Sequence, residues 1–166
     1  MKILFLFLTF SFLSVNLLAE NPGSQIPTMV IKTLDGREVS TTELQNEGKP
    51  FIVSFWATWC RPCLKELDAI NEIYHEFQEQ GFVVFAVSTD NARTRVNVLP
   101  MVSGRGWEFD FFLDENGDFS RAMGVNLVPH TFIFDGSGKL ASQHTAFVDG
   151  MEWDMLDKLV ELLENE

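Results

Sequence analysis

The chain has 166 residues, of which 46% are hydrophobic, and its 12 basic and 24 acidic side chains give a formal net charge of −12. This length fits one domain of ordinary size, and the apolar content argues against disorder. So acidic a chain repels phosphate, which excludes nucleic acid as a partner and excludes binding to an anionic bilayer through surface charge. Two cysteines and three histidines exclude a disulfide-stapled miniprotein and a zinc site built from four cysteines.

The N-terminus predicts a secretory signal peptide. Lys2 precedes an apolar run from Ile3 to Leu18, and Ala19 is a small residue before a polar stretch. The run is shorter than the roughly 20 apolar residues that span a bilayer. We therefore expect residues 1–19 to be cleaved as a signal peptide, with an uncleaved membrane anchor as the alternative because Leu17 is large for its position. Either interpretation predicts an extracytoplasmic (periplasmic) protein, in a compartment where disulfides persist.

Residues 20–25 predict a short tether, and residues 26–166 predict one folded domain. The domain begins with a β-hairpin signal, because Asp35-Gly36 separates the strand-like runs Met29–Leu34 and Glu38–Ser40.

A strand, a helix and a second strand are expected next. The pattern Ser40 to Glu43 is a capping box that opens a short helical turn. Phe51–Trp56 and Phe82–Ser88 are apolar runs of buried-strand length. Between them, apolar residues recur at helical spacing from Leu64 to Phe77, and Gly81 is the expected stop of that helix.

The second half of the chain alternates in the same way. A helix is expected over Asn91–Gly104, kinked or shortened by Pro100, followed by a strand over Trp107–Leu113 and a turn over Asp114–Gly117. A helical turn over Phe119–Met123 precedes an antiparallel hairpin of Thr131–Asp135 and Lys139–His144. An amphipathic helix over Glu152–Leu163 closes the domain. This order predicts an α/β fold with a mixed sheet and helices on both faces.

Both cysteines belong to one motif, Trp59-Cys60-Arg61-Pro62-Cys63, which follows a buried strand and opens a helix. The first helical turn brings the two sulfurs within bonding reach, and its N–H groups and dipole favour a thiolate on Cys60. Pro62 needs no N–H in the first turn, and Arg61 adds a positive charge. We expect Cys60 to exchange with the partner and Cys63 to resolve the mixed disulfide.

Two other interpretations of the motif are weaker. A purely structural disulfide over so short a loop removes little chain entropy. A zinc site is disfavoured because the chain has only two thiols and no histidine at the spacing of a zinc ligand. We therefore expect redox chemistry with neither a metal nor a cofactor.

The segments VSFWATWCRPCLKEL and VPHTFIFDGSGKL resemble the TlpA/ResA-type branch of extracytoplasmic thioredoxin-like proteins, over about Ile26 to Leu163. The resemblance implies a thioredoxin-like fold, with a central mixed β-sheet flanked by helices, an N-terminal β-hairpin extension and an inserted αβ unit. It also implies a thiol–disulfide oxidoreductase that reduces protein disulfides outside the cytoplasm. Its partners would be disulfide-containing or dithiol proteins and a membrane thiol–disulfide electron donor, because this chain has no third cysteine to relay electrons.

The resemblance also assigns site residues. Pro129 matches the cis-proline that faces the two cysteines, and the backbone of Val128 beside it would pair with the substrate. Glu66 matches an acidic residue that tunes the thiols, and its negative charge would oppose Arg61 and the helix dipole. An ordinary solvated helix face is the alternative for Glu66. Trp59 matches an aromatic residue that flanks the site, although packing alone would also explain it.

Three positions depart from related patterns. Ser54 replaces the buried aspartate of cytoplasmic thioredoxins. Asp68 stands where many members have a helix-kinking proline, which predicts a straighter helix. His130 follows the proline where threonine is frequent, so it is a candidate for titration near the sulfurs, with a partly buried strand histidine as the simpler interpretation. His75 is expected on a helix surface and His144 at a strand end.

Three alternative activities stay open beside disulfide reduction. A DsbA-like oxidant or isomerase would use the same site in the other direction, because reduction potential sets direction. A copper-binding chaperone would use Cys60, Cys63 and His130, although copper chaperones of similar fold space their cysteines one residue wider. A peroxiredoxin would need a Thr-x-x-Cys motif, whereas Thr58 stands only two residues before Cys60.

The segment Asn91 to Gly106 carries Arg93, Arg95 and Arg105 in an otherwise acidic chain. It is a candidate edge for docking a partner, and a plain solvated helix is the alternative.

Overall fold

The computed structural model describes residues 24–165, so the predicted signal peptide and most of the tether lie outside the described residues. The strands are β1 (Val30–Thr33), β2 (Glu38–Ser40), β3 (Phe51–Trp56), β4 (Val83–Ser88), β5 (Asp110–Leu113), β6 (His130–Phe134) and β7 (Leu140–Thr145). The helices are η1 (Thr41–Glu43), α1 (Arg61–Glu72), α2 (Tyr74–Gln80), η2 (Arg95–Asn97), α3 (Val98–Arg105), α4 (Asp118–Ala122) and α5 (Met151–Glu164).

The strands form one mixed sheet in the order β2-β1-β5-β4-β3-β6-β7. Its centre is parallel, because β3 pairs with β4 and β4 with β5 in the same direction. Its flanks are antiparallel: β1 joins the hairpin extension to β5, and the β6–β7 hairpin adds to β3. The predicted thioredoxin-like architecture, with its N-terminal hairpin and inserted αβ unit, is confirmed.

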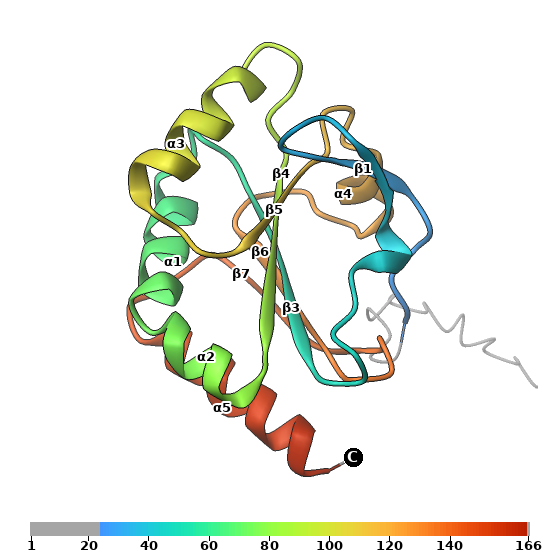
Figure 1. Ribbon diagram of the computed structural model, residues 1–166, viewed down its shortest axis with the longest axis vertical. Helices are drawn as coiled ribbons and strands as arrows, with labels where there is room; N and C mark the ends of the chain where they lie inside the picture. The colour runs from blue at the N-terminus through green and yellow to red at the C-terminus, as the bar shows by residue number, and fades with distance from the viewer. Residues whose placement is uncertain (1–23, 166) are drawn as a thin grey trace, which may run out of the picture.

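Helices cover both faces of the sheet. Figure 1 shows α1, α2, α3 and α5 on one side of the strands and α4 on the other. The face toward α1 buries a cluster that includes Ile52, Trp56 and Ile133. The opposite face buries six phenylalanines, which are Phe51, Phe55, Phe85, Phe119, Phe132 and Phe134. Successive strand residues point to opposite faces, so β3 and β6 contribute to both clusters.

The helix expected over Leu64–Phe77 is two helices. The chain breaks at Ile73, whose backbone has left helical geometry (φ −111°, ψ 13°). Ile73, Tyr74 and Phe77 are buried on either side of the break. The helix is interrupted at Ile73 and not at Asp68, where α1 is continuous as the missing proline predicts.

The inserted segment also differs from expectation. A turn and the 3-10 helix η2 occupy its start, and α3 begins only at Val98. Pro100 lies in the first turn of α3, where a missing N–H costs no helical hydrogen bond, so the proline marks a helix start and no kink. The strand expected over Trp107–Leu113 is confined to β5, because Trp107 folds back and donates a hydrogen bond from Nε1 to Asp68 Oδ1 (3.0 Å).

The N-terminal part of the described chain lies against the sheet. The Leu140 N–H donates to the Ser24 carbonyl (2.9 Å), and Gln25 forms a β-bridge with Lys139. Ile26 and Met29 then pack on the phenylalanine cluster. Within residues 24–165, none of the helices has both the length and the apolar character needed to cross a bilayer.

Candidate active site

The two cysteines lie where β3 ends and α1 begins. Cys60 is the N-cap of α1, and its N–H donates to the Ala57 carbonyl (3.0 Å). A disulfide joins Cys60 to Cys63, whose Cα atoms are 5.3 Å apart. Cys60 Sγ accepts a hydrogen bond from the Cys63 N–H (3.3 Å), one of the N–H groups that a helix N-terminus leaves without an intrahelical partner. The same N–H is therefore in place to stabilise a thiolate on Cys60 after reduction.

The two sulfurs differ in access. Cys60 is 5% exposed and Cys63 is fully buried. Arg61 and Pro62 between them are exposed, with Pro62 in the first turn of α1 as predicted. A partner can therefore approach Cys60 directly, while Cys63 is reached only from within the protein.

A second loop closes over the disulfide. The Val128–Pro129 peptide bond is cis, as the resemblance implies. The Val128 carbonyl oxygen lies 3.4 Å from Cys60 Sγ, and the Pro129 carbonyl accepts the Ala146 N–H (3.2 Å). A hydrogen bond from Ala146, the residue after β7, thus holds this loop on one side, and its other side faces the Cys60 sulfur.

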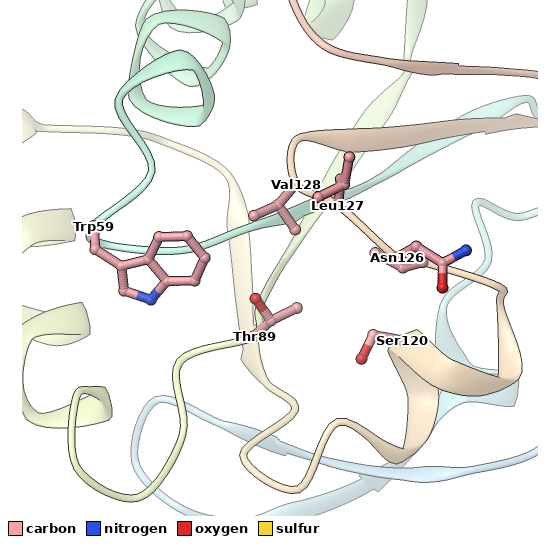
Figure 2. Close-up of a pocket in the computed structure, with 7 residues that line it drawn as sticks. Trp59, Thr89, Ser120, Asn126, Leu127 and Val128 are labelled. Atoms are coloured by element: carbon pink, nitrogen blue, oxygen red, sulfur yellow. The ribbon is translucent and has the colours of Figure 1, made fainter.

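A pocket of about 210 Å³ opens beside the disulfide. Figure 2 shows Trp59 reaching from the cysteine loop toward Val128, with Leu127 and Asn126 on the facing loop and Ser120 on α4. Trp59 is 64% exposed and Leu127 is 76% exposed. Two large apolar side chains therefore stay in solvent on either side of the reactive sulfur, which is unfavourable unless a partner covers them.

A buried carboxylate that the sequence analysis missed fixes the cysteine loop. Asp90 is fully buried and accepts hydrogen bonds from the Thr58 N–H (2.8 Å), the Thr58 hydroxyl (2.7 Å) and the Ser88 hydroxyl (2.9 Å). It follows β4, the parallel neighbour of β3, so both strand ends meet at the same edge of the sheet. The sequence signal that could have identified Asp90 is an acidic residue directly after a buried strand.

Glu66 does not lie on a solvated helix face. It is fully buried, and Oε1 accepts hydrogen bonds from Thr131 Oγ1 and from Ser54 Oγ (3.4 Å). His144 Nε2 lies 3.7 Å from the same oxygen. Within the described chain, no group donates a hydrogen bond to Oε2. The acidic group buried beside Ser54 therefore comes from α1. The strand position that holds an aspartate in cytoplasmic thioredoxins is Ser54, whose hydroxyl donates a hydrogen bond to Glu66.

His130 occupies the other side of the sheet. Its strand neighbour Thr131 faces Glu66, so alternation directs His130 to the phenylalanine face. There its ring stacks on Phe132 (centroids 4.2 Å apart), and Nε2 is 2.9 Å from Gln143 Oε1. This environment is that of a buried strand histidine.

Two of the three arginines of the inserted segment pair with acidic residues of this chain, and Arg93 is exposed. Arg95 pairs with Glu115 (3.2 Å), and Arg105 pairs with Asp68 and lies over the Trp107 ring. His75 is exposed on α2, as expected. Over residues 24–165, no three histidine, cysteine or acidic side chains are grouped so that they could hold a metal ion.

Comparison with known proteins places this site in a family. Residues 22–143 match the model of the AhpC/TSA family. The chain belongs to the AhpC/TSA family. Proteins named thiol-disulfide oxidoreductase ResA are similar to it: that of Bacillus anthracis is 31% identical over 121 residues, covering 73% of this chain and 68% of the relative. That of Geobacillus thermodenitrificans is 35% identical over 118 residues, covering 71% and 66%.

Among solved structures, a thioredoxin-like protein from Porphyromonas gingivalis has a TM-score of 0.75 and 44% identity, covering 87% of this chain and 95% of its own. A putative DsbE from Chlorobium tepidum has the same TM-score at 24% identity and supports the fold alone. This AhpC/TSA family member is therefore a thioredoxin-like thiol–disulfide oxidoreductase of the ResA type, with Cys60–Cys63 as its redox disulfide.

Proposed function

We propose that this protein reduces disulfide bonds of other proteins outside the cytoplasm. The observation that carries the proposal is the unequal access of the two cysteines: Cys60 caps a helix N-terminus and is 5% exposed, whereas Cys63 is fully buried. In the reduced protein, the Cys60 thiolate attacks a substrate disulfide and releases the first substrate thiol. Cys63 then attacks Cys60 Sγ, the second substrate thiol leaves, and the Cys60–Cys63 disulfide forms.

A protein substrate fits the surroundings of Cys60 better than a small thiol does. Trp59 and Leu127 offer exposed apolar surface on both sides of the sulfur, and aromatic side chains of this kind anchor protein interfaces. The backbone of Val128 beside Pro129 is the proposed pairing edge for the substrate chain, because its carbonyl already contacts Cys60 Sγ.

The charges around the disulfide favour reduction over oxidation. An oxidant such as DsbA has a stabilised reduced form, which requires a favoured thiolate. Glu66 is buried three residues after Cys63 on α1, so its carboxylate opposes a thiolate there with little solvent screening. Arg61 is exposed, and solvent screens its opposite effect. The buried charge therefore outweighs the exposed one, and Glu66 and Arg61 act as tuning residues of opposite sign.

The oxidised protein needs an outside source of electrons. Cys60 and Cys63 are the two cysteines of the sequence, so no third thiol in this chain can regenerate the dithiol. A membrane thiol–disulfide protein is the proposed donor, which fits the secretory N-terminus that the sequence predicts. Mass spectrometry of the protein recovered from the periplasm tests this location and should give an N-terminus at Glu20. A chain recovered intact in the membrane fraction would mean an anchor, and recovery in the cytoplasm would contradict the proposal.

The direction of the reaction is tested by the reduction potential and by insulin reduction. We expect a potential near or below about −250 mV and dithiothreitol-driven insulin reduction that Cys60→Ser abolishes. A potential near about −150 mV or above would instead assign an oxidant or isomerase. Insulin reduction no faster than with Cys60→Ser would reject the reductase altogether.

A further inference from the structure

We propose that His144 is the solvent end of a proton route that serves the buried Cys63 through Glu66. This inference rests on the proposed reductase function, because it concerns the proton that Cys63 must lose when it resolves the mixed disulfide. It makes His144 a positioning residue, since it acts through Glu66 and does not touch the reacting sulfurs.

The route begins with a polar row across three strands. Ser54 of β3 pairs directly with Thr131 of β6, and Thr131 pairs directly with His144 of β7. Directly paired residues of antiparallel strands project from the same face of the sheet. The three side chains therefore form a row on the face that α1 covers, and Glu66 of α1 contacts all three.

Glu66 connects this row to the inner cysteine. Cys63 and Glu66 are three residues apart on α1, so they are neighbours on the helix surface with Cβ atoms roughly 5–6 Å apart. Both are fully buried on the side of α1 that faces the sheet. A proton that leaves Cys63 therefore has an acceptor beside it inside the protein.

His144 connects the row to water. Ser54, Thr131 and Glu66 are buried, whereas the His144 side chain is 18% exposed. This partial exposure makes His144 the member of the group that can exchange a proton with water. Nε2 is 3.7 Å from Glu66 Oε1, so a shift of roughly 1 Å brings the pair to hydrogen-bond distance.

The proton transfer balances with the resolving step. The Cys63 thiol gives its proton to the Glu66 carboxylate as its sulfur attacks Cys60 Sγ. The bond between Cys60 and the substrate sulfur breaks, and the substrate leaves as a thiolate. Glu66 then passes the proton to the buried His144 Nε2, and the imidazolium releases its other proton from Nδ1 to water, which restores the carboxylate for the next turnover.

The elements around Glu66 and His144 carry other titratable groups. His130 of β6 faces the phenylalanine side, where it contacts Gln143. Lys65 and Arg61 on α1 are exposed, and Asp68 pairs with Arg105. The α5 helix, which contacts α1, carries its first-turn acids Glu152 and Asp154. Among these groups, His144 is the one with a contact to Glu66.

The test separates the two chemical steps. Reduced protein is mixed with the chromogenic disulfide DTNB, which releases one thionitrobenzoate when Cys60 attacks and a second when Cys63 resolves the mixed disulfide. We expect His144→Gln to slow the second release by about tenfold between pH 6 and 8, a modest share of what a positioned base contributes. The first release should stay within about twofold of wild type, because Cys60 does not use the route.

Two controls distinguish proton transfer from structure. Added imidazole should restore much of the second rate in His144→Ala, which leaves space for the ring, and should leave wild type unchanged. His75→Gln, at an exposed histidine, should behave as wild type. A second release unchanged in His144→Gln would overturn the route, and so would equal slowing of both releases without imidazole rescue. If wild type releases no second thionitrobenzoate, the proposed dithiol function fails before the route is at issue.

Discussion

The two faces of the central sheet use the same strands for different purposes. On the face away from α1, phenylalanines of β3 and β6 pack against one another, with Phe51 and Phe134 stacked (centroids 5.2 Å apart) and Phe55 edge to face on Phe132 (5.8 Å). On the face toward α1, the same strands place Ser54 and Thr131 under Glu66. Both faces thus bury apolar area, and the face toward α1 also buries a carboxylate and two hydroxyls, which is costly unless they are paired. The difference indicates that the polar group on the face toward α1 serves the chemistry of the nearby cysteines.

The largest effect is expected on the phenylalanine face. Phe119→Ala should lower the free energy of unfolding by about 3–5 kcal/mol, because α4 loses its buried anchor and leaves a cavity. Urea denaturation of the oxidised protein measures this loss, and the reduction potential should be unchanged. Val148→Ala, at an exposed apolar residue, is the control and should stay within about 0.5 kcal/mol. A large change in potential in Phe119→Ala would break the separation of the two faces.

A second prediction concerns Asp90, a buried carboxylate that serves geometry. Asp90→Ala should lower the free energy of unfolding by about 1–3 kcal/mol, because the Thr58 N–H and the Ser88 hydroxyl lose their acceptor. It should also slow the attack of Cys60, since Thr58 anchors the cysteine loop. Ser88→Ala removes one of these hydrogen bonds and should cost less, as measured by the same urea titration. Equal losses in the two variants would show that Asp90 does not hold the loop.

Glu66, by contrast, should act on redox chemistry. Glu66→Gln removes a negative charge beside Cys63 and favours its thiolate, so the reduction potential should rise by about 15–30 mV. Equilibration with dithiothreitol buffers and thiol trapping measures the shift. Glu72→Gln, at the exposed end of the same helix, should leave the potential unchanged. A fall in potential in Glu66→Gln would contradict the assignment of Glu66 as the group that favours reductase behaviour.

The smallest effect concerns the turn of the β6–β7 hairpin. Burial acts to raise the pKa of Asp135, but hydrogen bonds from the Lys139 N–H and from Ser137 outweigh it and hold the pKa below its usual 3.8. A lowered folded pKa stabilises the protein above about pH 4, and this stability is lost as the pH falls through the folded value. Because Asp135 is mostly solvated, the loss should be only a few tenths of a kcal/mol.

Urea midpoints between pH 5 and pH 2 measure this contribution. They should fall slightly more steeply with acid in wild type than in Asp135→Asn, which cannot titrate. Asp157→Asn, at an exposed residue of α5, is the matched control and should follow wild type. Identical slopes for wild type and Asp135→Asn would remove the hairpin turn from the acid response.

Local pattern predicted much of the fold and of the disulfide. The Asp35-Gly36 turn, the capping box at Ser40 and the helix opening at Cys60 all depend on residues within a few positions of one another. The polar row does not, because Thr131 is 77 residues from Ser54 along the chain. Only the strand register brings the two together, and periodicity carries no information about register between distant strands.

The same reason explains the missed residues. Asp90 meets Thr58 across 32 residues, and His144 meets Glu66 through the edge strand. The sequence predicted His144 at a strand end, which is correct, but it did not predict the contact of His144 with Glu66 on α1. The start of α3 at Val98 was also missed. The residues before Pro100 can form either a turn or a helix, and the spacing of apolar residues does not distinguish the two.

The contact of Ser24 and Gln25 with the start of β7 has a consequence for how the molecule behaves at high concentration. An open sheet edge can pair with the edge of another copy and start aggregation. Here one edge is β2, only three residues long, and the other is covered at Lys139 and Leu140 by the chain's own N-terminal segment. The protein thereby blunts β2 by its shortness and β7 at its start, and a chain shortened past Gln25 would leave the start of β7 free to pair with another copy.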